Sequence, residues 1–129
     1  MFKKETVKGT DIKFISTNLN APPVTFREAL LRGLAPDGGL YMPSSVPLLT
    51  SDEMESLMGM EYPELASKIV GKFTGDELSS EELESICSAV YSFSLPVEHI
   101  EGSSYILRLD QGPTASFKDF AALLMGRLM

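Results

Sequence analysis

The chain is poor in the residues that build disulfide frameworks and metal centres. Its 129 residues include one cysteine, one histidine and no tryptophan. The single cysteine, Cys87, excludes an intramolecular disulfide framework and is typical of a reducing compartment. Cys87 lies on an apolar helix face and is expected in the core. His99 has no cysteine or carboxylate cluster at ligand spacing, so we expect no metal site and a surface or packing role.

Positive charge is also scarce, with 11 lysines and arginines against 18 acidic residues and a net charge of −7. This balance lacks the basic surface that nucleic acids and anionic membranes bind, so neither is expected as a partner. No apolar run approaches the roughly 20 residues needed to cross a bilayer. None follows the polar start of the chain, as it would in a signal peptide. The sequence therefore predicts a soluble, cytoplasmic protein.

Three capping boxes predict where helices begin. In this motif a Ser or Thr side chain accepts the amide three residues on, and a glutamate there bonds back to the cap. The motif occurs at Thr25–Glu28, Thr50–Glu53 and Ser79–Glu82, and Pro63 suits the first position of a further helix. Apolar residues follow each start at the spacing of one helical face, which predicts a helix-rich chain.

Short strands are predicted at 12–16, 40–42 and 105–109. A turn at 35–39, with Gly38 and Gly39, precedes the second of them. The apolar fraction of 43% is enough for a core. A chain of this length fits one compact α+β, helix-rich unit, with room for a small appended part.

A strand–turn–helix pattern closes the sequence. A turn at 111–113 follows the last predicted strand, and Ser116 can cap a helix with Asp119 as its reciprocal partner. Apolar residues on this helix form a wide stripe: Phe117, Phe120, Ala121, Leu124, Met125 and Leu128. No C-cap signal precedes Met129, so we expect the helix to belong to a longer protein. Its stripe is expected to be exposed here and to favour self-association.

Lys118 lies at the predicted start of this last helix, between Phe117 and Phe120. Partial burial and the positive end of a helix would both lower the pKa of the lysine and favour a neutral amine. Such an amine can form a Schiff base with an aldehyde cofactor. The pattern alone favours an ordinary exposed lysine whose stem packs on the helix, because short motifs often match by chance.

Four segments resemble the threonine synthase family. Residues 112–120 read Gly-Pro-Thr-Ala-Ser-Phe-Lys-Asp-Phe and are similar to the family's signature around its cofactor lysine. Residues 14–18 resemble its opening strand, 24–43 its first helix and glycine turn, and 62–76 the helix that ends in Phe-x-Gly-Asp. The order and spacing of the four agree from about Ile12 to Met129.

The resemblance implies a pyridoxal-phosphate-dependent lyase of fold type II. Such an enzyme converts O-phospho-L-homoserine and water to L-threonine and phosphate, in the biosynthesis of amino acids. Lys118 would be both the catalytic and the cofactor-binding residue. Residues 1–95 would form the N-terminal domain and 96–129 the first strand and helix of the catalytic domain.

Family members are several times longer, and no glycine-rich phosphate loop is found here, so this chain alone is expected to be inactive. It also departs from the family at Asp110 and Gln111, where an aromatic residue and a histidine are common. A threonine-synthase-like phospho-lyase that makes no threonine is therefore one alternative. A short interaction module without catalysis is another.

Overall fold

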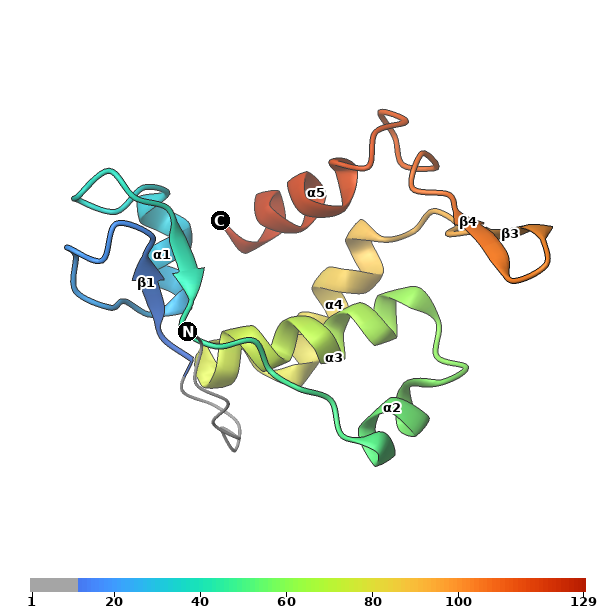
Figure 1. Ribbon diagram of the computed structural model, residues 1–129, viewed down its shortest axis with the longest axis horizontal. Coiled ribbons are helices and arrows are strands. Elements are labelled where there is room, and N and C mark those ends of the chain that lie inside the picture. Colours follow the sequence, from blue (N-terminus) through green and yellow to red (C-terminus); the bar gives the residue numbers. More distant parts are fainter. Residues whose placement is uncertain (1–11) are drawn as a thin grey trace.

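The computed structural model describes residues 12–129 as a small mixed α/β unit (Figure 1). In this range the elements are β1 (Phe14–Ser16), α1 (Phe26–Arg32), β2 (Tyr41–Pro43), α2 (Ser51–Leu57), α3 (Tyr62–Thr74), the short 3₁₀ turn η1 (Gly75–Glu77), α4 (Ser80–Val90), β3 (Val97–Glu101), β4 (Ser104–Leu107) and α5 (Asp119–Leu128). The predicted α+β, helix-rich character is confirmed. Within the described range, none of the helices has the length and apolar character needed to cross a membrane.

The first two strands and α1 form one end of the molecule (Figure 1). β1 pairs antiparallel with β2, so that Phe14 lies opposite Pro43. A small cluster of Phe14, Val24 and Ala29 is buried between them, and the ring of Phe26 packs edge-on against that of Phe14 at 5.7 Å. The strand predicted at 40–42 is confirmed but shifted by one residue to 41–43, because Pro43 pairs with Phe14 in the sheet.

All three predicted capping boxes are present, with Thr25, Thr50 and Ser79 accepting the amides of the glutamates three residues on. A further cap of α1 comes from far along the chain. The Glu77 carboxylate accepts the amides of Phe26 at 2.9 Å and Arg27 at 3.1 Å. The N-terminal amides of a helix lack partners within the helix, so Glu77 ties η1 to α1.

The antiparallel pair of α3 and α4 forms the centre of the molecule (Figure 1). Ala66, Cys87, Val90 and Tyr91 are the buried residues of the cluster between them. Cys87 is fully buried, as expected for a core residue, and burial raises the pKa of its thiol. α5 lies along α4 and packs Phe120, Leu123 and Leu124 against this cluster.

β3 and β4 form an antiparallel hairpin at the other end of the molecule (Figure 1). β4 matches the predicted strand at 105–109 in position but ends at Leu107. β3 was not predicted, because its sequence Val-Glu-His-Ile-Glu has neither an apolar run nor a strict apolar–polar alternation. Every residue of both strands is exposed, including Val97 at 62% and Tyr105 at 63%. His99 lies on this exposed hairpin with its ring 5.0 Å from that of Tyr105.

Candidate functional site

The turn between β4 and α5 carries Lys118 and is held by a carboxylate. Asp119 is 4% exposed, and its carboxylate accepts the Thr114 hydroxyl at 2.6 Å and the Thr114 amide at 2.8 Å. These two bonds lower the pKa of the Asp119 carboxyl, with the hydroxyl as the largest cause. A bond with the Ser116 backbone makes a smaller contribution to this pKa in the same direction. The predicted capping box of Ser116 and Asp119 is nevertheless wrong, because α5 begins at Asp119, with Lys118 as its N-cap residue and no side-chain cap. The Ser116 hydroxyl instead accepts the amide of Lys118 at 3.3 Å.

Two backbone features show how tightly this turn is folded. Gly112 lies against the Asp119 side chain, and a Cβ at Gly112 would come within 2.8 Å of the Cβ of Asp119. Ala115 has φ of +54°, a left-handed conformation that costs a residue with a side chain roughly 1–2 kcal/mol. Such strain persists only where surrounding contacts fix the backbone, as the Thr114–Asp119 bonds do here.

Lys118 is exposed at the N-terminal end of α5. Its carbonyl accepts the amides of Ala121 at 3.1 Å and Ala122 at 2.9 Å, so its backbone belongs to the first turn of the helix. Among the described residues, no carboxylate lies within ion-pair distance of its ammonium. The amine is therefore accessible on a backbone that is fixed on both sides.

The expected burial of Lys118 between two phenylalanines is wrong. Phe117 is 65% exposed, whereas Phe120 turns inward onto the cluster between α3 and α4. Phe117 precedes the first helical residue, so the three-residue spacing that places two side chains on one helix face does not apply to this pair. Burial therefore gives Lys118 no special chemistry in this chain.

Phe120 joins the turn to the rest of the molecule. Its ring lies 5.6 Å from that of Tyr62, 5.9 Å from that of Tyr91 and 5.3 Å from that of Phe93. Its carbonyl accepts the Tyr91 hydroxyl at 2.8 Å. The residue two positions after Lys118 is thus held by contacts with α3 and with the end of α4.

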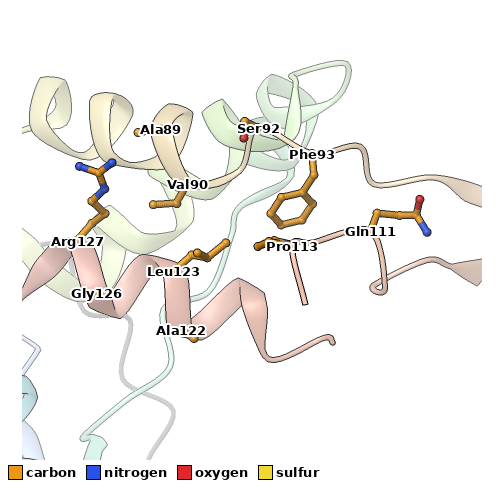
Figure 2. Close-up of a pocket in the computed structure, with 10 residues that line it drawn as sticks. All are labelled: Ala89, Val90, Ser92, Phe93, Gln111, Pro113, Ala122, Leu123, Gly126 and Arg127. Atoms are coloured by element: carbon orange, nitrogen blue, oxygen red, sulfur yellow. The ribbon is translucent and has the colours of Figure 1, made fainter. Parts of the chain in front are cut away.

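A cavity of about 580 Å³ lies beside this turn (Figure 2). Figure 2 shows Val90 of α4 and Leu123 of α5 facing each other, with Phe93 and Pro113 towards one end and Arg127 at the other. Lys118 does not line it. The cavity therefore marks the junction of α4, α5 and the 111–113 segment rather than the surroundings of the amine.

The two residues that depart from the family pattern take part in a surface ion-pair network. Asp110 accepts Arg108 Nε at 2.8 Å and Nη2 at 2.7 Å, and Gln111 Nε2 donates to the same carboxylate at 3.0 Å. Arg108 also pairs with Glu98 at 2.7 Å. The Arg108 guanidinium holds the pKa of the Asp110 carboxyl well below its usual range. This network joins the exposed hairpin to the start of the turn.

A second carboxylate-held turn lies near the other end of the molecule. Asp37 accepts the Ser16 hydroxyl at 2.6 Å, the Gly39 amide at 3.0 Å and the Asn20 amide at 2.9 Å. These bonds, the Ser16 hydroxyl first, lower the pKa of the Asp37 carboxyl. Ser16 is completely buried, and no local sequence pattern indicated its pairing with Asp37. Over the described residues, no group of three or more histidine, cysteine or acidic side chains is placed to hold a metal ion.

Comparisons with known proteins agree along most of the chain. The sequence family described as "Threonine synthase N terminus" matches residues 13–91. Threonine synthase of Pseudomonas aeruginosa is 37% identical over 123 aligned positions, gaps included, and the match covers 92% of this chain and 26% of that protein. Threonine synthase of Methylobacillus glycogenes is 35% identical over 131 aligned positions, and the match covers 91% of this chain and 27% of that protein.

Solved structures give the same result. The crystal structure of PLP-bound threonine synthase from Brucella melitensis has a TM-score of 0.87 at 36% identity, over 92% of this chain and 27% of that one. Threonine synthase from Escherichia coli has a TM-score of 0.85 at 30% identity, over 90% of this chain and 27% of that one. The chain spans about a quarter of the length of the curated relatives it matches.

Proposed function

The chain belongs to the threonine synthase N-terminal family, and on this premise we propose that it supplies the cofactor lysine of such an enzyme. The reaction would be the conversion of O-phospho-L-homoserine and water to L-threonine and phosphate, with pyridoxal phosphate attached to Lys118. One observation carries the proposal. Lys118 presents an accessible primary amine from a backbone that the buried Asp119 and the partly buried Phe120 fix on its C-terminal side.

The described residues fit part of what the cofactor needs. The Lys118 amine is exposed and has no ion-pair partner among residues 12–129, so it is available for a carbonyl group. Within residues 12–129 no phosphate cradle accompanies it, because the pair Gly38–Gly39 lies in the Asp37 turn, ahead of a strand. We infer that the rest of the longer family chain supplies the phosphate site.

Pyridoxal phosphate, when bound, supplies an electron sink for the carbanion chemistry of amino-acid substrates. The role of this chain in the proposed reaction would be to hold the cofactor and to move protons at Lys118 Nζ, which would act as base and acid. Asp119 keeps its charge on the two Thr114 donors, which leaves the amine of the preceding lysine without a competing carboxylate.

We also propose a division into an N-terminal domain of 1–95 and the start of a fold-type II catalytic domain at 96–129. The exposed hairpin supports this division. A two-stranded hairpin is marginally stable on its own, and this one exposes apolar side chains such as Ile100, Ile106 and Leu107 by 47–56%. A larger sheet in the longer protein would cover them. The expectation that the whole apolar stripe of the last helix is exposed is wrong, because Phe120 and Leu124 pack against the cluster between α3 and α4. In the isolated chain, the hairpin surface and the exposed Met125 and Met129 would favour self-association.

A chimera tests the proposed role of Lys118. Residues 12–129 would replace the matched N-terminal quarter of the Pseudomonas aeruginosa enzyme, and borohydride reduction with pyridoxal phosphate would be followed by peptide mapping. We expect one stable adduct, on Lys118, and threonine formation that is lost in Lys118→Ala. Lys68→Ala is the matched control, because Lys68 is exposed on α3 and paired with Glu84 at 2.7 Å. An adduct that persists in Lys118→Ala would refute the assignment.

The 129-residue chain alone is expected to be inactive. The measurement is phosphate release from O-phospho-L-homoserine with added pyridoxal phosphate. Turnover by the isolated chain would show that residues 1–129 contain a complete active site, contrary to the proposal.

A further inference from the structure

The hydroxyl of Tyr91 makes a long-range bond to the start of α5. Tyr91 follows the last residue of α4 and is 5% exposed. Its hydroxyl donates to the Phe120 carbonyl at 2.8 Å, across 29 positions of sequence. Phe120 is the second residue of α5 and lies two positions after Lys118. A single buried hydroxyl thus connects the helical centre of the molecule to the turn that carries the lysine.

The surrounding rings restrict how Tyr91 can move. Its ring lies 5.0 Å from that of Tyr62, 5.9 Å from that of Phe120 and 6.3 Å from that of Phe93. Two of these three ring contacts, with Tyr62 and Phe93, are edge-on, an arrangement that is favourable beyond the area it buries. The hydroxyl is therefore held in direction as well as in distance.

The hydroxyl stays protonated over the whole physiological range. Burial raises the pKa of Tyr91 to about 12, with smaller contributions from Tyr62 and Cys87. A neutral phenol is a donor, and a backbone carbonyl is an acceptor, so this bond does not depend on pH near neutrality.

We propose that Tyr91 is a positioning residue for Lys118: its hydroxyl holds the first turn of α5 through the Phe120 carbonyl and so fixes where the lysine presents its amine. The Thr114–Asp119 bonds hold the turn from within, across five positions of sequence. They shape the turn without orienting it against the rest of the molecule. The Tyr91 bond supplies that orientation from α4. The importance of Tyr91 for catalysis rests on the proposed function of Lys118, whereas its positioning of the first turn of α5 does not.

The chain offers a matched control in the same cluster. Tyr62 also places a phenol ring against Phe120, at 5.6 Å, and burial raises the pKa of its hydroxyl. Among the described residues, its hydroxyl has no hydrogen-bond partner in α5. Tyr62→Phe and Tyr91→Phe therefore each remove one hydroxyl and keep the ring, and only the second removes the bond to Phe120.

The test is NMR on the 129-residue chain and the two variants, without cofactor. In Tyr91→Phe we expect the backbone order parameter of Lys118 to fall from about 0.85 to about 0.7, because the first turn loosens. Exchange of the Ala121 and Ala122 amides, which bond to the Lys118 carbonyl, should become roughly fivefold faster. Amides of α4 should keep their protection, and Tyr62→Phe should leave both measurements unchanged.

A loss of overall stability alone would not change the order parameter of Lys118 in the native state. The measurement therefore distinguishes a positioning role of Tyr91 from a contribution to global stability. Unchanged order at Lys118 in Tyr91→Phe would overturn the proposal, as would an equal loss in Tyr62→Phe. The outcome is also distinct from that of the proposed function. If Tyr91→Phe loosens the turn but Lys118 forms no adduct in the chimera, the positioning stands and the cofactor assignment fails.

Discussion

The Asp37 turn and the Asp119 turn share the same hydrogen-bonding pattern but have different structural roles. Each carboxylate accepts a hydroxyl at 2.6 Å and a backbone amide at 2.8–3.0 Å. Each turn has a glycine with no room for a Cβ, Gly39 or Gly112. A residue with a side chain adopts a left-handed conformation near each, Leu19 with φ of 59° and Ala115 with φ of 54°.

The difference lies in what each carboxylate joins. Asp37 reaches back 21 positions to Ser16 and joins β1 to the turn before β2. Asp119 reaches back only five positions to Thr114. The first turn therefore holds part of the fold together, whereas the second shapes a local segment and depends on Phe120 and Tyr91 for its place. A turn that must present a reactive side chain can be rigid in itself and still need an external anchor.

Adding a methyl group at the two crowded glycines should have the largest effect. Gly39→Ala places a Cβ against the buried Ser16 hydroxyl and 2.9 Å from the backbone nitrogen of Asn18, so we expect a loss of about 3 kcal/mol. Gly112→Ala meets only the Asp119 side chain and should cost about 1–2 kcal/mol. Urea denaturation measures both.

Gly126→Ala is the matched control for these two changes. Gly126 lies within α5 with open space where a Cβ would be, so alanine should stabilise the chain by about 0.5–1 kcal/mol. Equal losses at Gly39 and Gly112 would contradict the difference drawn between a tertiary and a local turn.

Replacing each carboxylate with a neutral amide should lower overall stability at the Asp37 turn and loosen only the local segment at the Asp119 turn. In Asp37→Asn the Ser16 hydroxyl and two amides lose a charged acceptor, and we expect the melting temperature to fall by several degrees. In Asp119→Asn we expect a smaller fall, with faster amide exchange confined to Thr114 and the start of α5. Scanning calorimetry measures the melting temperatures, and hydrogen exchange shows which amides are affected. Exchange that spreads through β1 and β2 in Asp119→Asn would show that its turn is not local.

Acid should weaken both turns. The pKa of each carboxyl is lowered in the folded chain, so each contributes stability that is present above the unfolded value near 4 and is lost as the pH falls through the folded value. We therefore expect the melting temperature to decline below about pH 4, and to decline less in Asp37→Asn and Asp119→Asn. A pH dependence unchanged in both variants would show that other carboxylates, such as Asp110, dominate acid stability.

Relieving the left-handed residues should have the smallest effect. Ala115→Gly removes the strain of a positive φ and adds flexibility to the unfolded chain, which together should give a gain of about 0.5 kcal/mol. Leu19→Gly, at an exposed position, should behave in the same way. Chemical denaturation checks both. A clear loss in Ala115→Gly alone would show that the Ala115 methyl group makes contacts on which its turn depends.

Much of the fold could be predicted because its signals are local. The capping boxes at Thr25, Thr50 and Ser79 fix helix starts within four residues of sequence, and all three are present. The core role of Cys87 followed from helical periodicity in the same way. The prediction failed at Ser116, because α5 begins three residues later at Asp119 and the Asp119 carboxylate bonds mainly to Thr114.

The site was predicted only in part. Lys118 was identified by the turn and by the family signature, and its role as cofactor lysine stays a prediction. Its burial was predicted wrongly, because the direction in which Phe117 points depends on where the helix begins. No sequence pattern indicated Tyr91 or Glu77, since each acts on a backbone group that is 29 or more positions away.

Residues a few positions apart were enough to predict three helix starts, the main turns and the family to which the chain belongs. Only the folded chain shows that Phe120 faces the cluster and Phe117 the solvent, that Glu77 caps α1, and that Tyr91 bonds to the start of α5. The physical reason is that a hydrogen bond or ring contact across tens of residues forms only after packing has brought the partners together. Such contacts leave no periodic trace in the chain.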